Sequence, residues 1–512
     1  MKLLEDEASR LEMLMSAGEM ILAPEIFDRR VRQSAMERAR KRGIRLPTFT
    51  QLAGDAPMPA GTEARLRSVD PDAPEAPNLF RVHWFNAADR RERVEVPAHL
   101  VLPKALTGVD APILVLLGSY FPMIGAHKVL PAYAGLVTRL VSGSFDPERH
   151  RAIWPSTGNY CRGGVAISRI LGCDSVAVLP EGMSRERYDW LERWVSHPSH
   201  IVRTYGTESN VKEIYDKCNE LAANEENVIL NQFSAFSNYM AHFACTGSAC
   251  ERVFESYRRS NHSARAVAFV SATGSAGTIA AGDRLKSIYG TKIAAVEALE
   301  CPTMLENGYG EHNIQGIGDK HIPLIHNVMN MDAVIAVSDS FPDRLNLLFN
   351  SAAGKDYLAS RSDLDPDLLA AFSEIGISGL ANIVASIKLA RRMNYGPDDV
   401  IVTVATDSAR LYGTEMEAAA AKFFPERFGV ADAERVFASC LAGISDDHVL
   451  ELDQRERRRI FNLGYYTWVE QQGVAIEDFD RRSNQSFWRE VAASVPVWDE
   501  LITDFNAEAG LN

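Results

Sequence analysis

The sequence predicts an α/β protein with mostly parallel sheets, and three observations lead to this fold class. From about residue 78 onward, short β-branched runs alternate with longer amphipathic segments. The β-branched runs are apolar throughout, as expected of strands in a sheet that is covered on both faces. The composition, 46% hydrophobic and 24% charged, is that of a globular protein with a sizeable core.

The alternation of strands and helices can be followed along the chain. Seven runs are predicted strands: residues 112–117, 175–179, 201–204, 267–271, 293–296, 333–337 and 400–405. Amphipathic helices are predicted between them, among others at residues 165–171, 184–195 and 380–393. Helices that separate consecutive strands are the connections that parallel pairing requires.

The two ends of the chain differ from this central region. Apolar residues at 11–22 are spaced as on one face of a helix, and a stretch rich in Pro, Ala and Asp follows at 53–77. From about residue 420 the pattern becomes helical and polar. We therefore expect an N-terminal extension at residues 1–77, a core at 78–419 and a helical C-terminal extension at 420–512.

Charge and cysteine content exclude several classes of function. Acidic residues outnumber basic ones by 68 to 54, giving a net charge of −14, which argues against a nucleic-acid partner. No run of 18 apolar residues predicts a membrane span. The acidic start is unlike a secretory signal, and the seven cysteines, without a CxxC pair, predict free thiols rather than disulfides or a metal site. Together these features predict a cytoplasmic protein.

A glycine-rich turn is the strongest local sign of chemistry. Residues 271–279 read Ser-Ala-Thr-Gly-Ser-Ala-Gly-Thr-Ile, directly after a predicted strand and before a predicted helix. Small residues let backbone N–H groups approach an anion, and Ser275 and Thr278 add hydroxyl donors. The turn lacks Gly-Lys-Ser/Thr and is not GxGxxG, so it predicts a phosphate cradle of another kind. A purely structural turn is the alternative.

A second turn of small hydrogen-bonding residues, at 155–160, precedes a predicted helix. Hydroxyls and backbone donors at a helix start suit a carboxylate, although the turn taken alone is more typical of a helix N-cap. Two further tight turns, at 316–318 and 376–379, are weak signals singly because turns need glycine anyway.

Lys128 is the candidate nucleophile. It lies between the strand predicted at 112–117 and a helical run at 133–140. Most lysines are solvated charges, but an amine nucleophile needs a partly desolvated place that lowers its pKa. A lysine at a helix start, flanked by the apolar residues Val129 and Leu130, fits that requirement.

In their order along the chain, these features resemble the fold-type II pyridoxal-phosphate (PLP) enzymes, and most of all the cysteine synthase (O-acetylserine sulfhydrylase) and cystathionine β-synthase family. The resemblance covers about residues 100–415. It includes further stretches at 180–187, 231–233, 312–318 and 407–412. It implies a tryptophan synthase β-like architecture with two α/β lobes, twisted sheets, the cofactor between the lobes and a smaller mobile lobe at about residues 155–270.

The resemblance also implies a role for each candidate residue. Lys128 holds pyridoxal 5′-phosphate as a Schiff base and later moves the α-proton of the substrate. Ser378 faces the pyridine nitrogen with a neutral hydroxyl, which favours loss of a β-leaving group over transamination. Further cofactor contacts are expected from Asn159, Gly274, Ser275, Ala276, Gly277 and Thr278, and contacts to the substrate carboxylate from Ser156, Thr157, Asn159, Tyr160 and Gln232.

The implied activity is α,β-elimination or β-replacement on a small amino acid through an aminoacrylate, as in cysteine synthases and cysteine desulfhydrases. Deamination of serine, threonine or a diamino acid on the same core is an alternative, and a cofactor-binding partner protein without catalysis is a third. A homodimer is expected from the family. The serine and arginine that flank the lysine in the family are Ala126 and Leu130 here, which leaves the substrate open.

Overall fold

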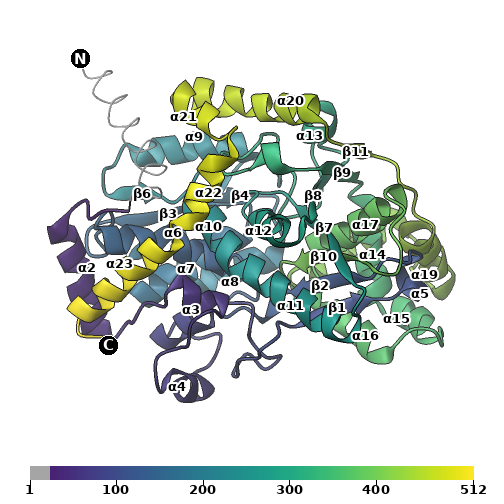
Figure 1. The fold of residues 1–512 in the computed structure, drawn as a ribbon, viewed down its shortest axis with the longest axis horizontal. Coiled ribbons are helices and arrows are strands. Elements are labelled where there is room, and N and C mark those ends of the chain that lie inside the picture. The colour runs from purple at the N-terminus through teal and green to yellow at the C-terminus, as the bar shows by residue number, and fades with distance from the viewer. Residues whose placement is uncertain (1–23, 512) are drawn as a thin grey trace.

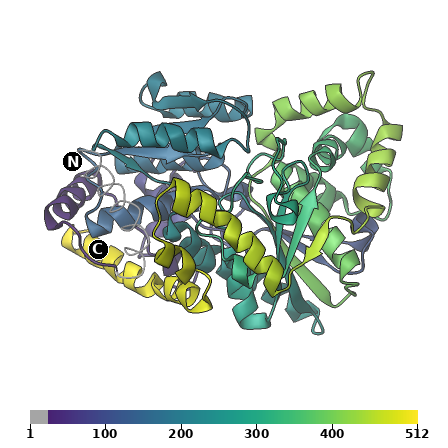
Figure 2. The ribbon, with the colours of Figure 1, turned by 90° about the horizontal axis from the view of Figure 1, so that it is seen from above.

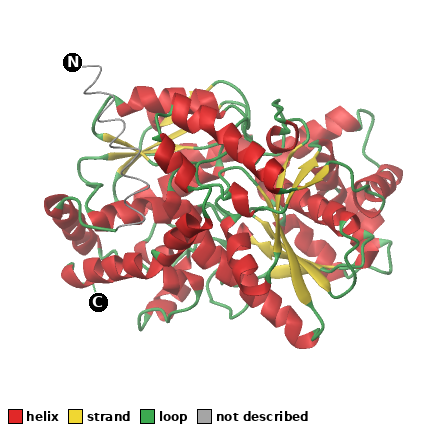
Figure 3. Cartoon of the chain, turned by 45° about the horizontal axis from the view of Figure 1, so that its top comes forward, coloured by secondary structure: helices red, strands yellow, loops and turns green. Residues whose placement is uncertain are grey.

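Two β-sheets organise the chain in the computed structural model, which describes residues 24–511. They lie in separate halves of the molecule and are surrounded by helices (Figure 3). The large sheet has the strand order β1-β2-β10-β7-β8-β9-β11, and the small sheet has the order β5-β4-β3-β6. The helical stripe predicted at residues 11–22 lies outside the described residues.

The large sheet is parallel at its centre and antiparallel at both edges. Its strands are β1 (His99–Leu102), β2 (Ile113–Leu117), β7 (Arg265–Ala272), β8 (Lys292–Ala298), β9 (Ala333–Val337), β10 (Asp399–Ala405) and β11 (Val449–Glu451). The small sheet is parallel throughout and contains β3 (Arg151–Pro155), β4 (Asp174–Pro180), β5 (Ile201–Thr204) and β6 (Asn227–Ile229). The predicted α/β fold with mostly parallel sheets is confirmed.

Both faces of the large sheet are buried, as the continuous apolar strands predicted. In β2, Leu114 and Leu116 enter one hydrophobic cluster, whereas Ile113 and Val115 enter the cluster on the opposite face. Helix α17 (Ile377–Arg392) covers one face and is backed by α14 (Ser340–Asn350), and α11 (Gly247–Ser260) and α12 (Ala280–Tyr289) cover the other. This double cover fixes the strand ends that carry the candidate site.

The small sheet is packed in the same way. Helix α7 (Asn159–Leu171) lies against β3 and β4 and is backed by α6 (Val129–Ser142), while α9 (Val211–Ala222) also packs on the sheet. The remaining helices are α2 (Arg29–Arg42), α3 (Phe49–Ala53), α4 (Thr62–Ser68), α5 (Lys104–Thr107), α8 (Arg185–Trp194), α10 (Phe236–Ala241), α13 (Thr303–Glu306), α15 (Ala352–Ala359), α16 (Pro366–Ala371), α18 (Gly413–Phe423), α19 (Val430–Phe437), α20 (Gln454–Tyr465), α21 (Ile476–Arg481), α22 (Gln485–Ala493) and α23 (Val495–Glu508).

The C-terminal helix returns to the N-terminal part of the chain. Figures 1 and 2 show α23, in yellow, beside the purple helices of the N-terminal segment. The Asp499 carboxylate accepts hydrogen bonds from the backbone N–H groups of Phe49 (2.6 Å) and Thr50 (3.0 Å). The amide of Asn506 bonds both the N–H and the C=O of Leu46. The two terminal segments therefore support each other. Within residues 24–511, no helix is both long and apolar enough to cross a membrane.

Candidate functional site

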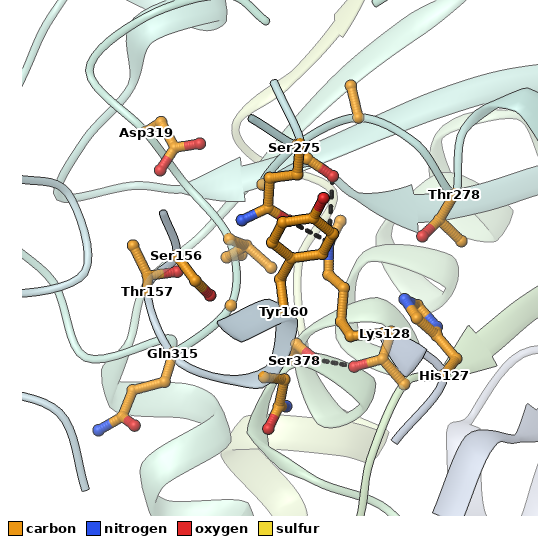
Figure 4. A pocket seen from close by; sticks show the side chains of 18 of the residues that line it. His127, Lys128, Ser156, Thr157, Tyr160, Ser275, Thr278, Gln315, Asp319 and Ser378 are labelled. Carbon is orange, nitrogen blue, oxygen red and sulfur yellow. Dashed lines mark hydrogen bonds between the residues drawn. The ribbon is translucent and has the colours of Figure 1, made fainter. Parts of the chain in front are cut away.

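A pocket of about 590 Å³ lies where the carboxyl ends of strands from both sheets meet (Figure 4). Loops that follow β3, β7 and β10 contribute to its wall, as do the starts of α6 and α17. Ligand sites in parallel α/β folds form at such strand ends, because the loops there converge.

Lys128 directly precedes α6 and reaches into this pocket (Figure 4). Its Nζ donates hydrogen bonds to Gln232 Oε1 at 2.9 Å and to Ser275 Oγ at 3.0 Å. Protein surrounds the side chain, and this desolvation lowers the pKa of Lys128 to about 8, although the charges of Asp319 and Glu208 oppose the shift. The amine is thus poised to lose its proton near neutral pH.

The glycine-rich turn lies beside the lysine, between β7 and α12. A Cβ built on Gly274 would lie 2.5 Å from the carbonyl oxygen of Gly316, so the two turns touch backbone to backbone. Ala276 adopts φ +60°, which redirects the backbone after Ser275. The Asn238 amide donates to Ser275 Oγ at 3.1 Å and holds that hydroxyl toward the pocket.

The turn at 155–160 links β3 to α7 and forms another side of the pocket. Ser156 Oγ accepts a hydrogen bond from the Gly158 N–H at 2.8 Å, which closes the turn at the start of the helix. Asn159 Nδ2 donates to Asp407 Oδ2 at 2.6 Å, and Asn159 Oδ1 accepts from Arg162 at 2.8 Å. Asn159 is therefore held on both sides by buried charged residues.

Ser378 enters the pocket from the start of α17. Its Oγ lies 3.1 Å from the hydroxyl of Thr406, the residue that follows β10. His127 also lines the pocket, and its backbone N–H donates to the Thr406 carbonyl at 2.9 Å. Both ring nitrogens of His127 are buried without a hydrogen-bond partner in the described part of the chain.

The fold brings nearly all the predicted site residues to one cavity. Lys128, Ser156, Thr157, Asn159, Tyr160, Gln232, Gly274, Ser275, Ala276, Thr278 and Ser378 all line it. Gly277 does not, because it packs against Asn238 instead. Tyr160 is only partly available: its ring packs edge-on against Trp154 at 5.4 Å, and its hydroxyl lies beside Gly135 of α6.

Two buried carboxyl groups near the lysine escaped the sequence reasoning. Asp319 lines the pocket, and its Oδ2 finds no hydrogen-bond partner among residues 24–511. Burial, and next the charge of Glu208, holds the pKa of Asp319 well above its usual range. Burial raises the pKa of Glu208 to about 7. Asp319 directly follows the glycine turn at 316–318, so its place beside a recognised motif could have marked it as a site residue. Glu208 lies in a polar loop with no such motif, and nothing in the sequence marks it.

The donor set fits pyridoxal phosphate. The cofactor needs an amine that can lose its proton, a backbone cradle for its phosphate and a partner for its ring. Lys128, the turn at 274–278 with its close approach to Gly316, and Ser378 supply these three groups around a single cavity. The turn at 274–278 consists of small residues, which leaves its backbone open to an anion.

Comparisons with known proteins agree with this fit. The family described as pyridoxal-phosphate dependent enzyme matches residues 96–344. Cysteine synthase B of Campylobacter jejuni is 30% identical over 255 residues, which are 49% of this chain and 74% of that protein. Cystathionine beta-synthase of Saccharomyces cerevisiae is 26% identical over 337 residues, which are 61% of this chain and 59% of that protein.

Solved structures show the same fold. A hydrogen sulfide-producing enzyme of Fusobacterium nucleatum superposes with a TM-score of 0.52 at 22% identity, covering 69% of this chain and 95% of that one. O-acetyl serine sulfhydrylase isoform 3 of Entamoeba histolytica gives 0.51 at 21% identity, covering 67% and 93%. From its sequence relatives, its fold and the geometry of its pocket, the chain belongs to the pyridoxal-phosphate dependent enzyme family.

Proposed function

We propose that this protein binds PLP covalently through Lys128 and catalyses β-replacement or α,β-elimination on a small amino acid, in the manner of a cysteine synthase. One observation supports this choice of residues most directly. The desolvated Nζ of Lys128 lies 3.0 Å from the Oγ of Ser275, and Ser275 belongs to the turn that is suited to bind a phosphate. The similarity to cysteine synthase B supports the reaction class.

PLP, when bound, supplies electron withdrawal from the α-carbon of the substrate. The chain must then remove the α-proton. Lys128 Nζ is the base, since its pKa of about 8 leaves a usable fraction of neutral amine at physiological pH. Ser378, whose Oγ lies beside the Thr406 hydroxyl, would offer the cofactor ring a neutral hydroxyl and no charge. The resulting site favours departure of a group from the β-carbon.

The turn at 155–160 would hold the substrate carboxylate. Ser156 and Thr157 stand at the N-terminus of the 13-residue helix α7, where backbone N–H groups and the helix dipole favour an anion. Gln232, whose Oε1 accepts from Lys128, presents its amide to the same cavity. These groups orient the α-carbon toward the amine that removes its proton.

Asp319 is our candidate for proton exchange with the substrate side chain. It is the one carboxylic acid among the described residues that line the pocket. Burial, and next the charge of Glu208, raises the pKa of this carboxyl and so favours its protonated form, which can protonate a departing group and recover the proton from an incoming nucleophile. In this assignment Asp319 would act on the group at the β-carbon, whereas Lys128 acts at the α-carbon.

Product analysis with a panel of amino acids tests the reaction class. Cysteine, O-acetylserine, serine, threonine and a diamino acid are incubated with the PLP-loaded protein, with and without sulfide. Sulfide release, or incorporation of the added nucleophile, supports the proposal. If ammonia and a 2-oxo acid form without sulfide release and without incorporation of the nucleophile, the protein is instead a deaminase. Lys128→Ala should abolish turnover, and the exposed Lys104→Ala serves as its control.

We also infer a homodimer, supported by the family to which the chain belongs, and a cytoplasmic location, supported by seven buried cysteines that form no disulfide. Light scattering on a sizing column tests the first, and a monomer would refute it. Cell fractionation tests the second, and a secreted or membrane-bound pool would refute it.

A further inference from the structure

A second pocket, of about 440 Å³, lies in the N-terminal segment, outside the region that the PLP family matches. It is formed between α4, which projects at the bottom of Figure 1, and residues 81–93. Four arginines and two glutamates line it, together with one histidine and one asparagine. Nothing in the proposed reaction uses these residues.

Arg81 lies at the floor of this pocket and is 1% exposed. Its terminal nitrogens donate to backbone carbonyls of Val69 (3.2 Å) and Leu66 and to the side chain of Asn78, so the guanidinium is fixed in place. Its Nε–H is buried and finds no acceptor in the described chain. A buried donor on a fixed cation, left without a partner, is a costly arrangement unless an anion satisfies it.

His83 presents a second such donor. It is also 1% exposed, and its Nδ1 accepts a hydrogen bond from the Phe85 N–H at 3.1 Å. Burial lowers the pKa of His83 to about 3, so the ring is neutral and its hydrogen resides on Nε2. That Nε2 is buried without a partner among residues 24–511. Arg81 and His83 therefore each bring a buried polar group to the lining of this pocket.

The rim of this pocket adds positive charge, which would attract an anion. Arg67 is paired with Glu92 at 3.5 Å, which leaves Arg81, Arg91 and Arg93 against Glu63. Four arginines against two glutamates give the pocket an excess of two positive charges. Burial, and next the charge of Arg91, lowers the pKa of Arg81 to about 10, although the charges of Asp89 and Asp70 oppose the shift.

We propose that this pocket is a binding site for a compact oxyanion, and specifically for a phosphate group, either free or carried by a small metabolite. A phosphate offers acceptor oxygens to the two floor donors and leaves further oxygens for the guanidinium groups of Arg91 and Arg93 at the rim. Its two negative charges match the excess positive charge of the lining. The site is separate from the Lys128 pocket and does not depend on the reaction proposed for it.

The test must keep phosphate out of the cofactor cradle at 274–278. We therefore saturate the protein with PLP, remove free cofactor, and titrate inorganic phosphate by calorimetry at constant ionic strength. Three variants are compared with wild type: Arg91→Gln/Arg93→Gln, His83→Phe, and Arg455→Gln/Arg458→Gln, which removes two exposed arginines elsewhere. A dicarboxylate and a phosphomonoester are titrated in parallel, and melting curves confirm that each variant is folded.

The proposal predicts one phosphate bound per chain, with affinity about tenfold or more weaker in Arg91→Gln/Arg93→Gln and weaker in His83→Phe, but unchanged in the control. Phosphate should also raise the melting temperature of wild type and of the control variant, but not that of the two site variants. Tighter binding of the phosphomonoester than of free phosphate would assign a metabolite. Absence of binding, equal binding in all four proteins, or selective binding of the dicarboxylate would overturn the assignment.

Discussion

Asn159 Nδ2 donates a hydrogen bond to Asp407 Oδ2 at 2.6 Å, and this contact joins the small sheet to the large one. Asn159 opens the helix after β3, whereas Asp407 follows β10. Asp407 also accepts from the Tyr412 hydroxyl at 2.7 Å and lies 3.8 Å from Arg187, and it is 1% exposed. The buried carboxyl of Asp407 thus links Asn159 of the candidate site, and with it the small sheet, to the large sheet.

Asp407→Asn keeps the shape of that side chain but removes its charge, which leaves the buried Arg187 without an anionic partner. We expect a loss of about 3 kcal/mol in the free energy of unfolding, together with weaker PLP binding because Asn159 loses its anchor. Urea denaturation and cofactor titration measure both effects. Asp446→Asn, at an exposed ion pair, should cost less than about 1 kcal/mol. Equal losses in the two variants would refute the interlobe role.

Gly274→Ala tests the contact between the two glycine turns. The added Cβ would lie 2.5 Å from the Gly316 carbonyl oxygen, so one of the turns must move. Overpacking of this kind costs about 1–3 kcal/mol, and we expect the dissociation constant of PLP to rise by about tenfold or more. Gly396→Ala is the matched control, since its Cβ would meet its nearest atom at 3.8 Å. Unchanged PLP affinity in Gly274→Ala would show that the loop does not cradle the phosphate.

Glu208→Gln should change stability in a pH-dependent way. Burial raises the pKa of Glu208 from 4.5 to about 7 in the folded protein. The folded state therefore keeps a proton that the unfolded state releases, so wild-type stability falls as pH rises from about 4.5 to 7. The variant has no carboxyl to ionise at this position. Its free energy of unfolding should therefore exceed that of wild type by on the order of 3 kcal/mol at pH 8, and should match it below pH 4.5. Urea unfolding curves of both proteins at pH 8 and below pH 4.5 measure this. The same difference in the free energy of unfolding at both pH values would contradict the raised pKa.

Asp319→Asn tests the acid assigned to the substrate side chain. General acid–base catalysis contributes about 10²–10⁴-fold, so kcat should fall by that order while the PLP spectrum stays that of wild type. In wild type, kcat should decline at high pH as the carboxyl of Asp319, with its raised pKa, loses its proton. The amide cannot ionise, so that decline should be absent in the variant. A variant with normal kcat and an unchanged alkaline limb would exclude Asp319 from proton transfer.

Apolar runs predicted the strands of this fold well where the strands are central. The interior strands β2, β7, β8, β9 and β10 were all predicted, because a strand buried on both faces consists of consecutive apolar residues. The antiparallel edge strands β1 and β11 were missed, since they are short and half-exposed. In the small sheet β3 and β6 were missed as well: β3 is framed by Arg151 and Pro155, which do not favour a strand, and β6 has only three residues.

The candidate site was predictable where a local motif marked it. Lys128 and the turns at 155–160 and 274–278 each carry small or reactive residues at an element boundary, and the fold brings them to one cavity. The environment of these residues was not predictable. The link from Asn159 to Asp407 spans 248 residues, and no local pattern reports such a distant partner. The same holds for Trp84, whose ring lies 5.9 Å from that of His127.

The most direct test of the account is to map the lysine that holds the cofactor. The protein is loaded with PLP, reduced with borohydride, digested and analysed by mass spectrometry, with Lys128→Ala treated in parallel. We predict one phosphopyridoxyl group per chain, on the peptide that contains Lys128, and none in the variant. A modified lysine elsewhere in wild type, or the same degree of labelling in Lys128→Ala, would contradict the central claim that Lys128 is the catalytic amine.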